Sequence, residues 1–205
     1  RCVVGVPWET ASKRAVLWGD SHAKHLLSLL DIPAREQSLS VVYWAGCPPF
    51  VGNEGNRREI RNKPDFAEDC AESRKDLFDW LATSPKLDLI ILSNAWAHYP
   101  RRRQMGKQTA DFDQGRALGL IKEALTETMA ELKPELHPVL IIGDVPGPGF
   151  VVPNCALQAV AKLWRKPCKR YQTYFNERDH PVETILADMA SDANHIYFLN
   201  TKKGL

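Results

Sequence analysis

The chain has 205 residues, of which 44% are hydrophobic and 25% are charged, as in an ordinary globular protein of one domain. Its 27 basic and 25 acidic side chains leave a net charge of +2, which is too small an excess for a nucleic-acid partner. No apolar run reaches the roughly 18 residues that a membrane span needs, and no signal peptide is recognisable.

Short apolar segments predict the strands of one sheet. Each segment is almost continuously apolar, which is typical of parallel strands that are buried on both faces. The segments cover residues 15–18, 39–44, 87–92, 139–142 and 196–199.

Helical patterns separate these segments, because apolar residues recur between them at steps of three and four. In the last of these patterns Val182 and Leu186 follow Pro181, a residue that suits the first turn of a helix. Alternating strands and helices predict one domain over residues 1–205 with an α/β fold. We expect a three-layer α/β/α sandwich with a five-stranded parallel sheet, similar to flavodoxin.

In such a sheet, ligands bind at the carboxyl ends of the strands. The loop after the first strand reads Gly19-Asp20-Ser21-His22. Ser21 could cap the next helix, because serine and aspartate are favoured at that position. It could equally be a nucleophile, because the first-turn N–H groups and the helix dipole favour an oxyanion there. Position alone leaves both interpretations open.

The letters "GDSH" resemble the first motif block of the SGNH (GDSL-like) hydrolases, and "LWGDSHAKHL" resembles the SGNH domain fused to membrane-bound acyltransferase family 3 proteins. The resemblance continues in order through "AGCPPF", Cys70, "DLIILSNAWAHY", "LIIGDVPGPG", "PNC" and "IYFLN".

This resemblance implies O-acyl transfer, with acetyl as the expected group, to or from bacterial cell-surface carbohydrate through a serine acyl-enzyme. It also implies partners: a lipopolysaccharide-type glycan as acceptor and a membrane acyltransferase domain as acyl donor. The expected location is the periplasmic or extracellular side of a bacterial membrane, within a larger membrane-anchored protein.

Carried over by motif, Ser21 matches the family nucleophile. Gly46 and Asn94 match the oxyanion donors, through a backbone N–H and a side-chain amide, although Leu92 stands where the family has the glycine of Gly-x-Asn. No metal or cofactor is expected, because a Ser–His mechanism needs neither.

Two further residues of the loop after the third strand are candidates for substrate contact. His98 could reach the pocket, and Trp96 could stack on a sugar ring. The alternatives are an exposed loop histidine and a tryptophan packed beneath the loop.

The family supplies its acid–base pair from an Asp-x-x-His block, and Asp192 and His195 have that spacing. His195, however, directly precedes the last strand, so strand length separates it from Ser21 by roughly 13–20 Å. A catalytic hydrogen bond needs about 3 Å. We therefore expect Asp192 and His195 to form a helix-to-strand turn. The true pair is expected beyond Leu205, in a C-terminal segment that this chain lacks.

The five cysteines include no CxxC pair, so neither a zinc site nor a thioredoxin-like redox site is indicated. Cys47 and Cys70 flank one polar loop and Cys155 and Cys168 another, so disulfides Cys47–Cys70 and Cys155–Cys168 would suit an oxidising compartment. Five reduced thiols are the alternative, and Cys2 has no evident partner.

Other functions compete with acyl transfer. A stand-alone carbohydrate esterase would use the same serine, and a non-catalytic glycan-binding module would keep the fold without the base. Binding of a phosphorylated cofactor is poorly supported, because the first loop contains a single glycine, Gly19.

Overall fold

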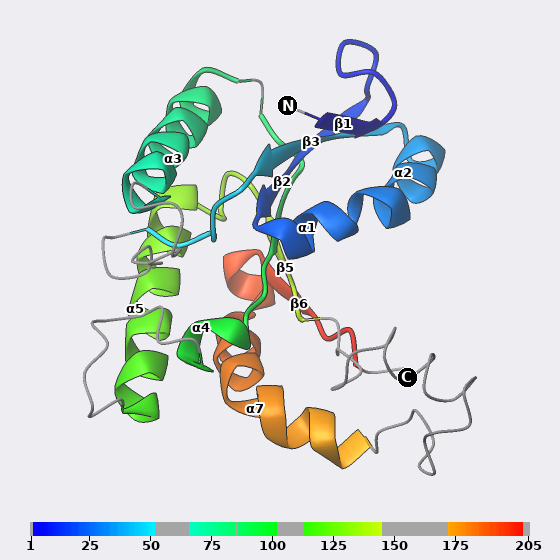
Figure 1. Ribbon diagram of the computed structural model, residues 1–205. Helices are drawn as coiled ribbons and strands as arrows, with labels where there is room; N and C mark the ends of the chain where they lie inside the picture. The colour runs from blue at the N-terminus through cyan, green and yellow to red at the C-terminus, as the bar shows by residue number, and fades with distance from the viewer. Residues whose placement is uncertain (1, 52–65, 85, 102–112, 145–171, 203–205) are drawn as a thin grey trace, which may run out of the picture.

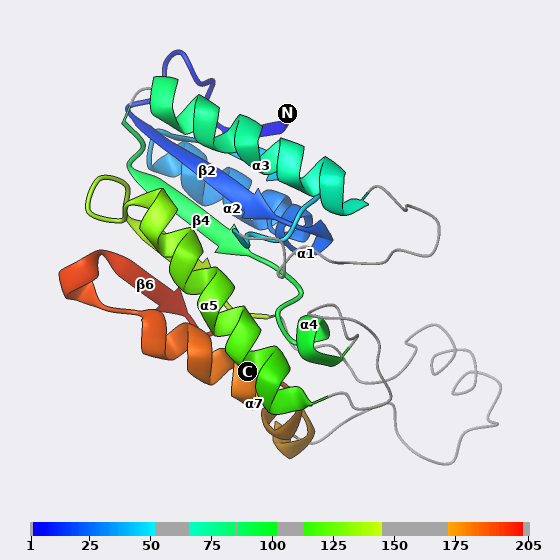
Figure 2. The same cartoon turned by 90° about the vertical axis from the view of Figure 1, so that its left-hand side faces the viewer.

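The computed structural model describes residues 2–51, 66–84, 86–101, 113–144 and 172–202. These residues form a six-stranded sheet with the order β1-β3-β2-β4-β5-β6 and helices on both of its faces (Figure 1; Figure 2). The strands are β1 (Cys2–Gly5), β2 (Lys13–Gly19), β3 (Leu39–Ala45), β4 (Leu89–Ser93), β5 (Val139–Ile142) and β6 (Ile196–Leu199). The helices are α1 (Ser21–His25), α2 (Leu27–Glu36), α3 (Phe66–Thr83), α4 (His98–Arg101), α5 (Gln114–Leu132) and α7 (Gln172–Met189).

Strands β2 to β6 are parallel, which confirms the predicted strands and the three-layer α/β/α architecture. Alternate residues of β2 point to opposite faces, as the pleat of a strand requires. Val16 and Trp18 pack in the core beneath α3 and α5, whereas Ala15 and Leu17 pack beneath α1 and α2. Burial on both faces explains why these segments are continuously apolar.

The prediction of five strands was wrong by one, because β1 pairs antiparallel with β3 at the edge of the sheet. Its sequence, Cys2–Gly5, has only four residues, and its first residues are exposed. A short edge strand with one solvated side lacks the long apolar run that identifies an interior strand.

The predicted start of the last helix was also wrong. Helix α7 begins upstream, at Gln172, and Pro181 lies inside it. The proline suits a first turn locally because it has no N–H to donate. Burial of Val182 and Leu186 in the core holds the helix after Pro181, and the local signal does not show how far it extends before that residue.

One predicted disulfide is confirmed: Cys47 and Cys70 are bonded, with 5.4 Å between their Cα atoms. The bond joins the loop after β3 to α3, where both cysteines are buried together with Phe66. The predicted pair Cys155–Cys168 lies outside the described residues. Cys2 is exposed and its thiol is free.

We predict that the double substitution Cys47→Ala and Cys70→Ala lowers the free energy of unfolding by about 3 kcal/mol, because the bond closes a loop with a sequence separation of 23. Urea denaturation under oxidising conditions would measure the loss, with Cys2→Ser as the control that should unfold like the unmodified protein. An unchanged midpoint in the double variant would contradict the prediction.

Candidate active site

The carboxyl ends of β2, β3, β4 and β5 bring the predicted site residues to one edge of the sheet. Gly19 is in register with Ala45 and Ser93, and Ser93 is in register with Ile142. The residues that follow are therefore neighbours: Asp20 and Ser21 after β2, Gly46 after β3, Asn94 after β4 and Asp144 after β5.

The turn after β2 is built around Asp20. This buried residue is the N-cap of α1: its Oδ1 accepts the N–H of His22 at 2.8 Å, and its Oδ2 accepts the N–H of Ala95 at 3.3 Å. Ser21 is exposed and is the first residue of α1. The N-cap interpretation of Ser21 is therefore wrong, because its neighbour fills that role.

Tyr43 supports the same turn from β3. Its hydroxyl donates to the Asp20 carbonyl oxygen at 3.0 Å. Burial raises the pKa of the Tyr43 phenol, and the negative charge of Asp20 raises it further. The phenol therefore keeps its proton and remains a donor across the neutral pH range.

A cavity of about 490 Å³ lies beside Ser21, on the β3 side of β2. Its volume falls within the range of small-molecule sites in proteins. The lining residues are Cys2, Asp20, Ser21, Lys24, Tyr43, Ala45 and Gly46.

Gly46 has a backbone conformation with φ of +99°, in which a side chain would be strained. Its N–H donates to the Gly19 carbonyl oxygen at 3.2 Å. To stabilise an oxyanion, this N–H must be shared with Gly19 or released from it.

Asn94 is 1% exposed, and its Oδ1 accepts the hydroxyl of Tyr99 at 3.4 Å. Its Nδ2 has no hydrogen-bond partner among the described residues. Leaving a buried donor without an acceptor costs about 1–3 kcal/mol. A bound ligand that supplies the acceptor would explain why the protein keeps this donor.

His22 and Asp144 form a pair that the sequence analysis did not predict. The imidazole Nδ1 lies 3.0 Å from Asp144 Oδ1. Two more histidines lie close by: the ring centroid of His98 is 5.6 Å from that of His22, and the centroid of His25 is 6.0 Å from it. The only sequence signal was the place of Asp144 in a loop at the ligand-binding edge.

The structure keeps Asp192 and His195 apart from Ser21. Ile196 is in register with Val139, Val139 with Ile90, and Ile90 with Val16. His195 therefore lies at the amino edge of the sheet, where it ends the 3₁₀ turn Asp192–Asn194. From the level of Ala15 to Ser21 the strand direction alone spans roughly 20 Å.

Trp96 belongs to the core. It is 1% exposed, its Nε1–H donates to the Ile142 carbonyl oxygen at 2.8 Å, and its ring packs against Phe50. The prediction that Trp96 stacks on a sugar ring was wrong, because both its apolar surface and its single donor are satisfied inside the protein.

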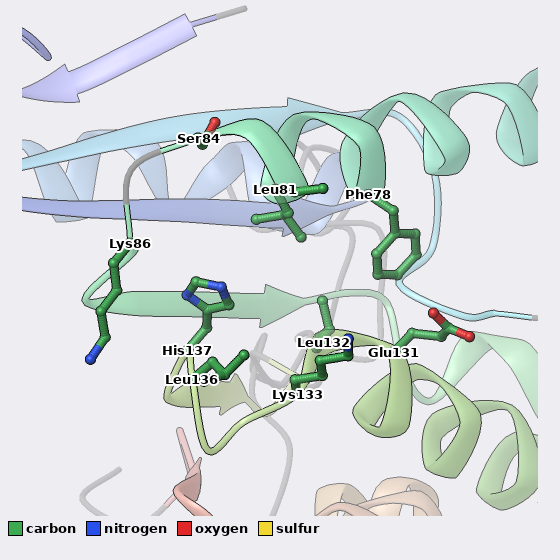
Figure 3. Close-up of a pocket in the computed structure, with 10 residues that line it drawn as sticks. Phe78, Leu81, Ser84, Lys86, Glu131, Leu132, Lys133, Leu136 and His137 are labelled. Atoms are coloured by element: carbon green, nitrogen blue, oxygen red, sulfur yellow. The ribbon is translucent and has the colours of Figure 1, made fainter.

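A second cavity, of about 580 Å³, lies near the other end of the sheet, between the C-terminal parts of α3 and α5 (Figure 3). Leu81, Leu132 and Leu136 line it together with Lys86 and His137. None of the residues from the carboxyl edge contributes to it, so it is separate from the candidate site.

Within the described ranges, no group of three or more His, Cys, Asp or Glu side chains is placed to hold a metal ion. None of the helices in the described part of the chain has the length and apolar character of a membrane span.

Comparison with known proteins adds two findings. The family model of the SGNH domain (fused to AT3 domains) matches residues 1–204. The fold is similar to the periplasmic domain of the lipopolysaccharide acetyltransferase of Salmonella ser. Paratyphi A, with a TM-score of 0.59 and 13% sequence identity over 96% of this chain and 72% of that chain. No curated protein matches the chain.

Proposed function

The chain belongs to the family of SGNH domains that are fused to AT3 domains, and on that premise we propose that it transfers O-acyl groups to bacterial cell-surface carbohydrate through a serine acyl-enzyme at Ser21. The proposed acyl group is acetyl. Removal of the same groups by hydrolysis is the related activity of the same serine.

The unpaired amide of Asn94 is the observation that carries this proposal. This buried donor, which has no partner among the described residues, lies after the strand next to that of Ser21, at the same edge of the sheet. This is what an oxyanion site requires: a donor held in place before the charge develops. The N-terminus of α1, where Ser21 stands, contributes further N–H groups in its first turn.

The reaction takes two steps. The Ser21 Oγ attacks the acyl carbonyl, its proton leaves to a base, and the oxyanion is stabilised by Asn94 Nδ2 and by Gly46 N–H once that group is freed from Gly19. A sugar hydroxyl or a water molecule then attacks the acyl-enzyme, and the Ser21 oxygen departs with a proton. Attack by the sugar hydroxyl completes transfer, and attack by water completes hydrolysis.

The proposed partners follow from the family. Fusion to AT3 domains supports a membrane acyltransferase domain as acyl donor. The name of the similar solved structure, a lipopolysaccharide acetyltransferase periplasmic domain, supports a glycan acceptor and a periplasmic or extracellular site. His98 is proposed to contact the substrate, because its ring lies next to that of His22.

The test is to label the protein, in its full length, with a fluorophosphonate and to locate the label by peptide mass spectrometry. We expect the label on Ser21. An acyl-sugar donor, given with and without an acceptor glycan, then separates transfer from hydrolysis. Glycan binding without any label on Ser21 would contradict the proposal and favour a binding module.

We predict that Asn94→Ala lowers the rate of Ser21 labelling by about 10²–10³-fold, because it removes an oxyanion donor. The free energy of unfolding should fall by about 1–3 kcal/mol, because the substitution also removes the buried Oδ1 that accepts the Tyr99 hydroxyl. Labelling kinetics and thermal denaturation measure the two effects. Tyr99→Phe is the matched control, because it removes only the hydroxyl that donates to Asn94 Oδ1. Equal rates in Asn94→Ala and the unmodified protein would contradict this role.

A further inference from the structure

We propose that His22 and Asp144 form the binding site for the attacking hydroxyl group of the acceptor, on the side of Ser21 that faces β4 and β5. This inference rests on the proposed function and assigns its second half-reaction to particular residues.

Both members of the pair are held in place by other groups. Asp144 is buried, its Oδ2 accepts the N–H of Ala97 at 3.0 Å, and its carbonyl oxygen accepts the hydroxyl of Thr201 at 2.6 Å. The backbone of His22 is held by the Asp20 cap. The imidazole ring therefore has a fixed orientation, with Nδ1 toward Asp144.

The carboxylate also decides which nitrogen of the ring carries the proton. An ionised carboxylate can only accept, so Nδ1 must donate to it. In the neutral ring Nε2 then has the lone pair, and it can accept a hydrogen bond from a hydroxyl group. The His22 side chain is 34% exposed, so it reaches the surface where an acceptor would arrive.

Helix geometry indicates that His22 Nε2 binds the hydroxyl of the acyl acceptor and not the hydroxyl of Ser21. Successive residues of an α-helix point about 100° apart, so adjacent side chains do not face each other. His22 is thus placed beside the reacting serine, where the oxygen that attacks the acyl-enzyme must come.

The order of the strands divides the site in the same way. Besides Asp20, Ser21 and Lys24, the cavity next to Ser21 is lined from β1, β3 and the loop after β3. Asp144 and His98 come instead after β5 and β4, on the other side of β2. We assign the cavity to the acyl donor and the His22 side to the acceptor.

In this step the acceptor hydroxyl gives its proton to His22 Nε2 while its oxygen bonds to the acyl carbon. The bond between that carbon and the Ser21 oxygen then breaks, the departing oxygen takes up a proton from water, and His22 returns its proton to water. The acyl group has changed oxygen atoms, and no proton or electron is gained or lost. Among the described residues, the titratable groups close to His22 include Asp144, His98 on α4, and Asp20 and His25 at the two ends of α1.

The experiment compares His22→Gln, Asp144→Asn and the double variant in the full-length protein. Fluorophosphonate labelling of Ser21 reports the first half-reaction, and acyl release to an acceptor glycan from preformed acyl-enzyme reports the second. We expect labelling within about 3-fold of the unmodified protein and acyl release lowered by about 10²-fold. The double variant should be no slower than His22→Gln, because Asp144 acts through His22.

Two further variants keep the inference open to contradiction. His137→Gln is the control, because His137 lines the separate cavity and should leave both rates unchanged. Added imidazole should restore part of acyl release in His22→Ala, which a purely structural role would not produce. Unchanged acyl release in His22→Gln, or an equal loss of labelling, would overturn the inference while the proposed function stands. Failure to label the unmodified protein would overturn both.

Discussion

Replacing Ser21 with alanine is expected to abolish acyl transfer and leave the fold intact. The substitution removes the oxygen that would carry the acyl group, so the rate should fall by at least about 10⁴-fold. Stability should hardly change, since Ser21 is exposed and the cap of α1 is Asp20. Two measurements are needed: the O-acyl content of the glycan made by cells with the variant, and thermal denaturation of the purified protein.

The matched control is Ser28→Ala, an exposed serine on the neighbouring helix α2, which should keep full activity. Ser21→Cys tests the chemistry further, because a thiol can form an acyl intermediate and should stay acylated in mass spectra. Transfer at the normal rate in Ser21→Ala would show that the serine only shapes the turn.

The second large effect is expected at Gly19, the last residue of β2. A Cβ atom there would overlap the Ser93 carbonyl oxygen of β4, and it would lie 2.9 Å from the Cβ of Ala23 on α1. Both neighbours are buried and neither can move away without opening the sheet or lifting the helix. We predict that Gly19→Ala lowers the free energy of unfolding by about 4 kcal/mol, as measured by urea denaturation.

Gly119 provides the comparison, because it is exposed in α5 and a Cβ there would meet nothing within 4 Å. Gly119→Ala should raise the free energy of unfolding by about 0.5–1 kcal/mol, because alanine has a higher helix propensity than glycine. Equal stability of the two variants would show that close packing of the strand end is not what requires glycine at position 19.

The interior strands and the edge that holds the site could be predicted because they depend on local patterns. A strand buried on both faces must be apolar at every position, and parallel strands must end at a common edge. The same reasoning placed Ser21 at the ligand-binding edge and separated His195 from it. It missed β1, because an edge strand with four residues leaves no such pattern.

By itself, the sequence determined the layers, the sheet direction and the place of Ser21, whereas it left the disulfide between Cys47 and Cys70 as one of two alternatives. The tertiary structure alone decided which side chains pair across the site. His22 and Asp144 are 122 residues apart, and only the register of β2, β4 and β5 brings them to 3.0 Å. Trp96 can lie in the core because the Ile142 carbonyl oxygen accepts its indole N–H there. Local patterns record burial and backbone conformation, whereas the partner of a polar group depends on which distant loops the sheet places beside it.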